Sequence, residues 1–421
     1  MPDAPTAAAE EPARLAAWLA RNAVDSLPAG ALAAKLAKAR EQDRPLRVKL
    51  GIDPTAPDIH LGHAVVLRKL AEFQRAGHKV VLIIGDYTAR VGDPSGRSEL
   101  RPMLSPEQIE ANAATFQEQA LKILDGDRER LEVRRNGEWL DMPMVDLLAL
   151  VRTTTAAQLL ERDDFAKRWS ANKPISLLEL LYPLLQAYDS VAIDADVELG
   201  GTDQKFNLLL GRDIQRAYGK PEQAILTMPL LVGVEGQRKM SKSLGNQIGV
   251  TDAPEEIYGK TMSIPDEAIG EYRRLLLDDR GDSLERSPEA SPHASVAPTP
   301  QGSFARDAKR ALARGLVRWL YSEQAADSAE RHFERVFVER DAPEEIADAS
   351  YAREDGAVHL PALIAAEFGM SSSQARRLID EGAVTLGDAA LGRGQYDVPS
   401  DRADGQVLKV GKRRFRRLRA A

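Results

Sequence analysis

The chain has 421 residues, 43% of them hydrophobic and 29% charged, a composition typical of globular proteins with room for more than one domain. Its 57 basic and 64 acidic side chains give a formal net charge of −7, so any contact with nucleic acid must be local. The sequence has no cysteine, which excludes disulfides and thiol catalysis, and no apolar run long enough for a membrane span or signal peptide, so we expect a cytoplasmic protein without membrane contact.

The first part of the chain predicts helices followed by a strand–turn–helix unit. Residues 1–40 contain two stretches rich in Ala and Leu, which predict an N-terminal helical segment without chemistry. Alternating apolar residues over 46–52 predict a strand that enters the core. Apolar residues at helical spacing follow as far as Gly77, and we expect this helix to begin at Pro57 and Asp58.

Two histidines, His60 and His63, lie in this strand-to-helix turn. A helix N-terminus offers unpaired N–H groups and the positive end of the helix dipole, so it suits a phosphate, to which imidazoles three residues apart can add hydrogen bonds. Gly62 between them removes a side chain where a flat ring could lie against the backbone. Taken alone, the pair is also compatible with a structural role or a weak metal site.

A second strand, followed by a loop with charged residues, is predicted next. The apolar run Lys79–Ile84 predicts a buried parallel strand, and the loop 91–97 follows at its carboxyl end. Open α/β sheets bind ligands at such ends, although Asp93 and Pro94 alone also fit a plain turn. We further predict a helix from Ser105 to about Ile123.

The middle of the chain predicts a helical insertion and one helix with a polar stripe. Residues 131–140 predict a hairpin around Asn136-Gly137, and 141–175 predict helices. The helix predicted over Ser176–Tyr188 places Tyr182, Gln186 and Asp189 on one stripe. Taken alone, Asp189 fits a cap of the next segment and Tyr182 a core aromatic.

A second glycine-rich passage from a strand into a helix, after the turn that contains His60 and His63, predicts the fold class. Val191–Asp196 predicts a strand, Gly200–Gln204 leads from it into a helix, and Ala224–Met228 predicts another strand. The two crossings predict an α/β fold with a doubly wound parallel, Rossmann-like sheet. From about 255 the pattern becomes helical, with a loop rich in Pro and Ser at 287–302.

The last part of the chain predicts a compact unit of short helices and strands with a local basic patch. A run of basic residues is usually a solvated face, but in an acidic protein this one favours contact with RNA. The candidate RNA-binding residues are Arg376, Arg377, Lys412, Arg413, Arg414, Arg416 and Arg417.

Two segments carry a resemblance to a known family. His60-Leu61-Gly62-His63 and, far downstream, Lys239-Met240-Ser241-Lys242-Ser243 resemble the paired signatures of class I aminoacyl-tRNA synthetases. The resemblance implies ATP as substrate: the histidines donate to its phosphates and the two lysines neutralise the leaving pyrophosphate. Arg97 and Arg101 are further candidate phosphate partners. Mg²⁺ would arrive with ATP, and we predict no metal site in the protein itself.

Within this family the chain is similar to the bacterial tyrosyl-tRNA synthetases, through Tyr182–Asp189 and Gly200–Gln204. This resemblance implies activation of L-tyrosine to tyrosyl-adenylate and transfer to tRNA(Tyr) by a homodimer. The ATP-binding residues that it implies are Gly51, Gly62, Gly201, Asp203, Met240 and Lys242. The tyrosine-binding residues that it implies are Asp53, Asp93, Tyr182, Gln186, Asp189 and Gln204, with Asp189 accepting the phenol O–H.

The resemblance also implies a domain order and leaves two alternatives. The predicted parts are a helical segment at 1–40, a catalytic domain at 41–255 with an insertion at about 115–175 used for dimer contacts, an anticodon-binding-type helical domain at 256–350 with a flexible loop at 285–303, and an S4-like RNA-binding domain at 357–421. Lys49 and Leu50 depart from the better-known branch of the family, which has tyrosine and cysteine there. The alternatives are a tryptophan enzyme of the same fold and a non-catalytic RNA-binding protein.

Overall fold

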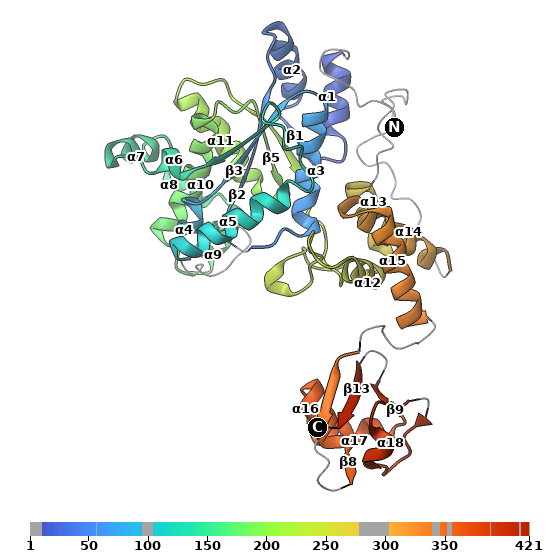
Figure 1. Ribbon diagram of the computed structural model, residues 1–421. Helices are drawn as coiled ribbons and strands as arrows, with labels where there is room; N and C mark the ends of the chain where they lie inside the picture. The colour runs from blue at the N-terminus through green and yellow to red at the C-terminus, as the bar shows by residue number, and fades with distance from the viewer. Residues whose placement is uncertain are drawn as a thin grey trace. The chain divides into compact units, whose positions relative to one another are not determined.

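A computed structural model of the chain describes residues 11–55, 57–94, 104–277, 303–338, 346–351, 356–387, 389–411 and 414–420. The chain forms two compact units, Met1–Ser322 and Glu323–Ala421. Figure 1 shows the first as helices around a central sheet and the second as a smaller α+β unit. The predicted loop at 287–302, Arg97 and Arg101 lie outside the described residues.

The first unit is built on a mainly parallel six-stranded sheet in the order β1-β6-β5-β2-β3-β4. The neighbours from β6 to β4 pair in parallel, and β1 pairs antiparallel with β6 at one edge. The strand order reverses next to β2, as a doubly wound sheet requires, which confirms the predicted fold class. The strands are β1 (Asp25–Leu27), β2 (Arg47–Ile52), β3 (Lys79–Ile84), β4 (Leu131–Arg135), β5 (Val197–Gly201) and β6 (Ala224–Met228).

Helices cover both faces of this sheet (Figure 1). α3 packs against β3 and β5, whereas α10 packs against β2 and α11 against β5 and β6. α10 has a capping box at its start, in which the Ser176 hydroxyl accepts the N–H of Leu178 and the Glu179 carboxylate accepts the N–H of Ser176. The helices of this part are α1 (Pro12–Ala20), α2 (Ala31–Glu41), α3 (Leu61–Arg75), α4 (Thr88–Val91), α5 (Pro106–Ala120), α10 (Leu177–Ala192) and α11 (Lys205–Ala217).

Three predicted element boundaries are wrong. α3 begins at Leu61, after the predicted start at Pro57, because the side chain and backbone of His60 cap the helix. The hairpin predicted around Asn136-Gly137 is β4 followed by the short helix α6 (Gly137–Leu140), since the Gly137 N–H donates to Asp86 instead of closing a turn. The strand predicted at Val191–Asp196 begins at Val197, because α10 continues to Ala192.

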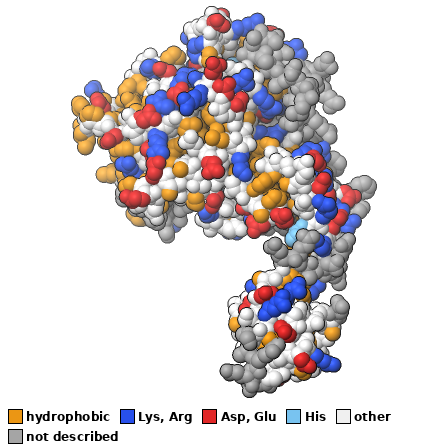
Figure 2. All heavy atoms as spheres, viewed as in Figure 1, with side chains coloured by type: hydrophobic (Ala, Val, Ile, Leu, Met, Phe, Trp, Pro, Cys, Tyr) orange, Lys and Arg blue, Asp and Glu red, His pale blue; other side chains and the backbone are white. Residues whose placement is uncertain are grey.

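The helical insertion exposes several large apolar side chains. It contains α7 (Met144–Val151), α8 (Ala156–Leu160) and α9 (Asp163–Ser170). Figure 2 shows hydrophobic side chains gathered at the margin of the molecule where Figure 1 places α7. The exposed large apolar residues of α7, α9 and the start of α10 are Met144, Val145, Leu148, Trp169, Leu177 and Leu178.

Helices complete the first unit after the sheet. Tyr272 is buried, and its hydroxyl donates to the carbonyl of Val232 at 2.6 Å, which fixes α13 against the segment before the lysine loop. No helix within the described ranges is both long and apolar enough to cross a membrane. The elements are η2 (Lys242–Leu244), α12 (Pro254–Ser263), η3 (Asp266–Ala268), α13 (Ile269–Leu276) and α14 (Ser303–Leu320).

The second unit has a five-stranded sheet in the order β10-β9-β12-β13-β7 and a separate β11-β8 pair. Leu360, Ile364, Ile379, Leu408 and Leu418 belong to its own hydrophobic core. The basic residues Arg414, Arg416, Arg417 and Arg419 lie on the strand β13. The elements are α15 (Glu323–Phe333), η4 (Glu334–Val338), β7 (Asp348–Tyr351), β8 (Ala357–His359), α16 (Leu360–Phe368), α17 (Ser372–Asp380), β9 (Val384–Leu386), β10 (Ala389–Ala390), β11 (Asp397–Pro399), α18 (Ser400–Ala403), β12 (Val407–Val410) and β13 (Arg414–Ala420).

Candidate active site

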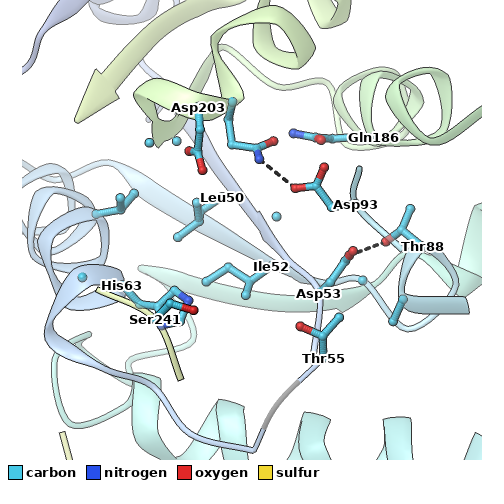
Figure 3. A pocket seen from close by; sticks show the side chains of 18 of the residues that line it. Leu50, Ile52, Asp53, Thr55, His63, Thr88, Asp93, Gln186, Asp203 and Ser241 are labelled. Carbon is cyan, nitrogen blue, oxygen red and sulfur yellow. Dashed lines mark hydrogen bonds between the residues drawn. The ribbon is translucent and has the colours of Figure 1, made fainter. Parts of the chain in front are cut away.

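A cavity of about 670 Å³ opens at the carboxyl ends of β2, β3 and β5 (Figure 3). This is the position at which a doubly wound sheet binds its ligands, because the chain crosses to opposite faces from neighbouring strands. Most of the predicted substrate-binding residues line this one cavity although they come from distant parts of the sequence. They are Gly51, Asp53, His60, Gly62, His63, Asp93, Tyr182, Gln186, Asp189, Gly201, Asp203, Gln204, Lys239, Met240 and Lys242.

His60 and His63 form one rigid pair at the start of α3. Their rings stack with centroids 3.9 Å apart. The Nδ1 of His60 accepts the Gly62 N–H at 3.1 Å, and the Nδ1 of His63 accepts the His60 N–H at 3.3 Å. Each neutral ring therefore carries its proton on Nε2, where it is a hydrogen-bond donor. A Cβ at Gly62 would lie 2.9 Å from the His60 ring, so glycine is required for this stacking.

Burial keeps both imidazoles uncharged. It lowers the pKa of His60 to about 2, helped by His63 and Lys239. Burial also lowers the pKa of His63 to about 4, again with a contribution from Lys239. At neutral pH the pair therefore offers two N–H donors and no net charge, so the positive charge of this part of the cavity comes from the lysines.

The lysine loop lies on the other side of the cavity, and carboxylates hold its two lysines. The ammonium of Lys239 is 3.1 Å from the carboxylate of Asp203, and Lys242 pairs with Asp58. Asn246 accepts the Ser241 N–H at 2.8 Å and so fixes the loop backbone. A polyanion in the cavity would compete with these carboxylates for the ammonium groups.

Asp189 lies at the inner end of the cavity, almost fully buried. Its carboxylate accepts the indole N–H of Trp139 at 2.8 Å and lies 3.5 Å from the side-chain amide of Asn136. Burial raises its pKa to about 7, and the nearby Lys49 and these two donors oppose the rise. A buried carboxylate at this position suits a ligand that brings a hydroxyl donor.

A second carboxylate, Asp53, lies between β2 and α10. It accepts the hydroxyl of Tyr182 at 2.9 Å and that of Thr88 at 2.7 Å. Burial raises the pKa of Tyr182 well above its ordinary value, and the charges of Asp53 and Asp93 add to this effect, so the phenol stays protonated. The side chain of Tyr182 is therefore a fixed part of the cavity wall, and its hydroxyl is polar but uncharged.

A third set of hydrogen bonds connects Asp93 with Gln204 and, through Asn207 on α11, with Gln186 on α10. Asp93 accepts the amide N–H of Gln204 at 2.8 Å (Figure 3). It also lies 3.5 Å from the guanidinium of Arg162. Asn207 donates at 2.9 Å to the side-chain oxygens of both Gln186 and Gln204. This part of the cavity wall is therefore rich in oxygen acceptors, which suit a cationic group of a ligand.

Five residues that position the site are missing from the sequence prediction: Thr88, Asn136, Trp139, Arg162 and Asn207. Asn136 and Trp139 follow β4, where the Asn-Gly pair predicted a hairpin turn and gave no indication of a role in the site. Arg162 and Asn207 are buried polar residues whose partners are distant in sequence. Of these five residues, only Trp139 had a usable signal in the sequence, because it is an aromatic residue with an N–H donor next to an apolar helix. Its partner Asp189 could not be predicted from sequence spacing.

The candidate RNA-binding residues that the structure describes lie on α17 and β13. Arg376 stacks over Tyr396 at 5.6 Å, whereas Arg377 pairs with Glu381 at 3.2 Å. Arg416 pairs with Glu367 at 2.8 Å. Arg414 is exposed and Arg417 half-buried, and the predicted Lys412 and Arg413 lie outside the described residues.

The fold and the site together define a nucleotide-dependent enzyme of class I synthetase architecture. Residues 41–338 match the model of the family described as tRNA synthetases class I (W and Y). The chain belongs to this family, as the resemblance of its two signature segments predicted.

Curated relatives match nearly the whole chain. The tyrosine–tRNA ligase of Thermotoga maritima is 48% identical over 401 residues, which cover 95% of this chain and 96% of the relative. The tyrosine–tRNA ligase of Salinibacter ruber is 48% identical and is covered to 95%, again with 95% of this chain.

Solved structures share the fold. A C-terminally truncated mitochondrial tyrosyl-tRNA synthetase of Aspergillus nidulans superposes with a TM-score of 0.58 at 22% identity, covering 77% of this chain and 94% of that one. The tyrosyl-tRNA synthetase of Archaeoglobus fulgidus, solved with L-tyrosine, gives 0.56 at 22% identity, with 76% and 99% covered. At this identity the likeness supports the architecture alone.

Proposed function

We propose that this chain activates L-tyrosine with ATP and transfers it to tRNA(Tyr), the activity that gives its curated relatives their name. One observation of the site carries the choice of tyrosine: the buried carboxylate of Asp189 at the closed end of the cavity. As an enzyme of translation it would act in the cytoplasm.

The phenol end of the substrate would meet Asp189. A phenol O–H donates to this carboxylate, whereas phenylalanine leaves the carboxylate buried without that donor. A site of this kind rejects the analogue by about 10⁴-fold. Tryptophan brings an N–H on a larger ring, and the indole of Trp139 already occupies one side of Asp189.

The ammonium and carboxylate of tyrosine would lie toward the mouth of the cavity. Asp93, Tyr182 and Gln186 offer oxygen atoms to the ammonium group, and Asp53 and Gln204 lie near the reacting carboxylate. These residues come from distant parts of the chain, but two hydrogen-bonded groups hold them: Tyr182 with Asp53, and Asp93 with Gln204 and, through Asn207, with Gln186. Such preorganisation aligns the carboxylate for in-line attack on the α-phosphorus.

ATP would lie between the histidine pair and the lysine loop. The Nε2–H groups of His60 and His63 donate to phosphate oxygens, and Lys239 and Lys242 neutralise the pyrophosphate as the bond to it breaks. Asp203 would accept the ribose hydroxyls once Lys239 moves to the phosphates. The backbone of Gly51, Gly62 and Gly201 lets the nucleoside approach closely, beside Met240. Mg²⁺ would travel with the triphosphate.

The second unit would hold the tRNA as an S4-like domain. Its exposed cations on α17 and β13 supply local positive charge in an acidic chain, and phosphate contacts of this kind give affinity without base specificity. The candidate contacts are Arg376, Arg377, Lys412, Arg413, Arg414, Arg416 and Arg417. Arg97 and Arg101 remain candidate phosphate partners in the first unit.

We further propose a homodimer through the insertion. The six exposed large apolar side chains of α7, α9 and the start of α10 form a surface that water solvates poorly, with Leu177 80% exposed. A second copy of the chain presents the same surface, and such a self-complementary contact is the commonest route to a two-fold dimer.

The deciding experiment is ATP–pyrophosphate exchange with each of the twenty amino acids. We expect exchange with tyrosine alone, followed by charging of tRNA(Tyr). Exchange with tryptophan would retain the reaction and refute the assignment of Asp189. No exchange with any amino acid would refute the enzyme and leave an RNA-binding protein.

A further inference from the structure

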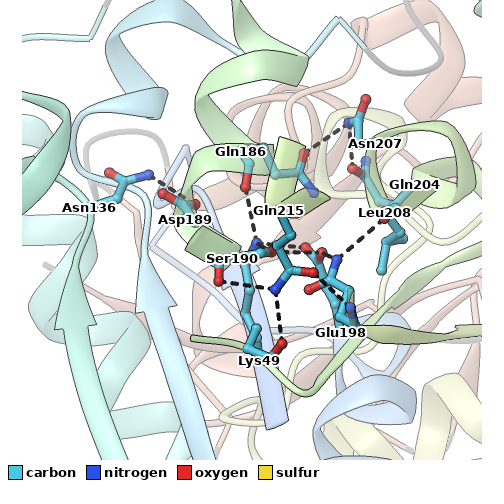
Figure 4. Close-up of polar contacts among 12 residues, drawn as sticks. Lys49, Asn136, Gln186, Asp189, Ser190, Glu198, Gln204, Asn207, Leu208 and Gln215 are labelled. Carbon is cyan, nitrogen blue, oxygen red and sulfur yellow. Dashed lines mark hydrogen bonds and ion pairs between the residues drawn. The ribbon is translucent and has the colours of Figure 1, made fainter. Parts of the chain in front are cut away.

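Lys49 is a fully buried lysine behind the tyrosine pocket. It lies on β2, and its side chain is 0% exposed. Its ammonium contacts the carboxylate of Glu198 at 2.8 Å, the hydroxyl of Ser190 at 2.8 Å and the carbonyl of Gln186 at 3.0 Å (Figure 4). Three acceptors therefore use the three N–H donors of this side chain.

Glu198, the partner on β5, is equally enclosed. Its carboxylate also accepts the hydroxyl of Ser190 at 3.2 Å and the side-chain amide of Gln223. Removing two charges from water is costly, and well-packed apolar residues would serve stability at least as well. A role in the neighbouring site accounts for the pair better than stability does.

The contacts of Lys49 fall on the turn of α10 that carries the substrate-binding residues. Gln186 accepts from Lys49 with its backbone and from Asn207 with its side chain. Asp189 directly precedes Ser190, which Lys49 also holds. On the cavity side, Trp139 donates to Asp189. Lys49 of β2 therefore holds this turn on the side away from the cavity, and Trp139 after β4 holds it on the cavity side.

The charges around Asp189 are few and come from three elements. Lys49 on β2 is the cation among them and Glu198 on β5 an anion, while Tyr182 is a neutral phenol on the same helix. The segment after β4 contributes Asn136 and Trp139, which do not titrate. A Cβ at Gly51, two residues after Lys49 on β2, would lie 3.9 Å from the Asp189 carboxylate, so the strand and the carboxylate are close neighbours.

We propose that Lys49 is a positioning residue of the tyrosine site: its ammonium, fixed by Glu198, holds the Gln186–Ser190 turn and places a positive charge behind Asp189, so that Asp189 meets the phenol as a carboxylate. This inference rests on the proposed function. It assigns to β2 a part in substrate specificity although Lys49 does not line the cavity.

The effect of losing this charge has a definite sign. Burial raises the pKa of Asp189 and Lys49 opposes that rise. Lys49→Met removes the opposing charge, so the carboxylate titrates at higher pH. The acidic limb of kcat/KM for tyrosine should therefore move up by about one pH unit. Glu198→Gln removes an anion and should move the same limb down.

The test uses the full-length chain in tyrosine-dependent pyrophosphate exchange between pH 6 and 9. Lys49→Met should raise KM for tyrosine by about tenfold or more, with KM for ATP nearly unchanged. The double variant Lys49→Met with Glu198→Gln removes both charges and should recover the melting temperature while the tyrosine KM stays high. Lys69→Met is the matched control, because Lys69 is a buried lysine paired with Glu72 on α3, away from the cavity.

Two outcomes would overturn the proposal. One is a pH profile and tyrosine KM of Lys49→Met that match those of Lys69→Met. The other is equal losses for tyrosine and ATP that the double variant repairs, which would make the pair structural only. If the parent enzyme shows no exchange with tyrosine, the proposed function fails instead, so the two failures are distinguishable.

Discussion

At the scale of single residues, Asp189 shows how burial converts an ordinary side chain into a specific one. In water a carboxylate has no preference among donors, but inside the cavity it is held by Trp139 and is costly to leave without a further partner. The same burial makes both histidines of α3 neutral donors. Chemistry at this site therefore follows from the surroundings of each residue as much as from its type.

The first prediction concerns substrate choice. Asp189→Ala should lower the preference for tyrosine over phenylalanine by about 10³-fold or more, because the buried acceptor that phenylalanine leaves unpaired is gone. The measurement is the ratio of kcat/KM for the two amino acids in pyrophosphate exchange. A ratio that stays at the parent value would place phenol recognition elsewhere.

The second prediction concerns stability and pH at the same residue. In the folded protein burial raises the pKa of Asp189 to about 7 from 3.8, so folding resists its ionisation and this residue contributes less stability as pH rises from about 4 through 7. Asp189→Asn removes that cost. The variant should melt roughly 3 to 6 °C above the parent at pH 8 and by less at pH 5. Calorimetry at both pH values measures the two shifts, and a shift at pH 8 that is no larger than the shift at pH 5 would contradict the prediction.

At the scale of elements, the site depends on where strands end. β2 and β5 each deliver a glycine to the cavity, and α3 and α10 begin or pass beside it. The lysine loop is the exception, because it lies outside the sheet: Asn246 and the Val232–Lys239 bridge fix its backbone, whereas Asp203 and Asp58 hold the ammonium groups of Lys239 and Lys242. A loop held in this way can exchange its carboxylate partners for phosphates without unfolding anything.

The third prediction tests this loop. Lys242→Ala should slow tyrosyl-adenylate formation by about 10²-fold while tyrosine affinity stays nearly unchanged, because the lysine acts on the leaving group. Asp58→Asn, which frees Lys242, should retain at least the parent rate. Single-turnover kinetics with equilibrium tyrosine binding separate the two steps. Arg238→Ala, in the same segment but paired with Glu235, is the control, and a loss there equal to that of Lys242→Ala would contradict a specific role.

At the scale of the whole molecule, the two units differ in the features that they contain. The first contains the cavity and the exposed apolar surface of the insertion, and the second has its own core and the basic side chains. Each unit buries its own hydrophobic residues, so we expect changes in one unit to leave the fold of the other intact.

The fourth prediction separates the units. Deleting 357–421 should leave tyrosine-dependent exchange close to the parent rate but lower tRNA charging by about tenfold or more. The full-length double variant Arg376→Ala with Arg377→Ala should weaken charging in the same direction, and its difference from the parent should become smaller at higher salt because fewer phosphate contacts give a shallower salt dependence. Normal charging by both variants would exclude the basic tail from tRNA binding.

The fifth prediction concerns assembly. Leu148→Asp places a charge in the apolar surface of α7, where the side chain is 61% exposed, and should yield a monomer because a buried carboxylate at the interface would have no partner. Light scattering after gel filtration measures the mass. Val24→Asp changes another exposed apolar residue outside the insertion and should leave the dimer intact. A monomeric parent would refute the dimer itself.

Sequence alone determined the parts of this protein that depend on local pattern. Runs such as Lys79–Ile84 and Ala224–Met228 predicted their strands without error, because short apolar runs bounded by turn residues fit a buried strand and are too short for a typical helix. The two signature segments and the polar stripe of α10 predicted the residues that line the cavity. Boundaries failed where a cap or a side-chain bond overrode propensity, at His60 and at Gly137.

Tertiary structure decided what depends on partners distant in the chain. The pairing of Trp139 with Asp189, of Lys242 with Asp58, and of Lys49 with Glu198 joins residues that no periodicity relates. The pKa of a buried group is decided in the same way, since it depends on burial and on charges from other elements. Local sequence sets which side chains are available, and packing sets which of them become neutral, charged or reactive.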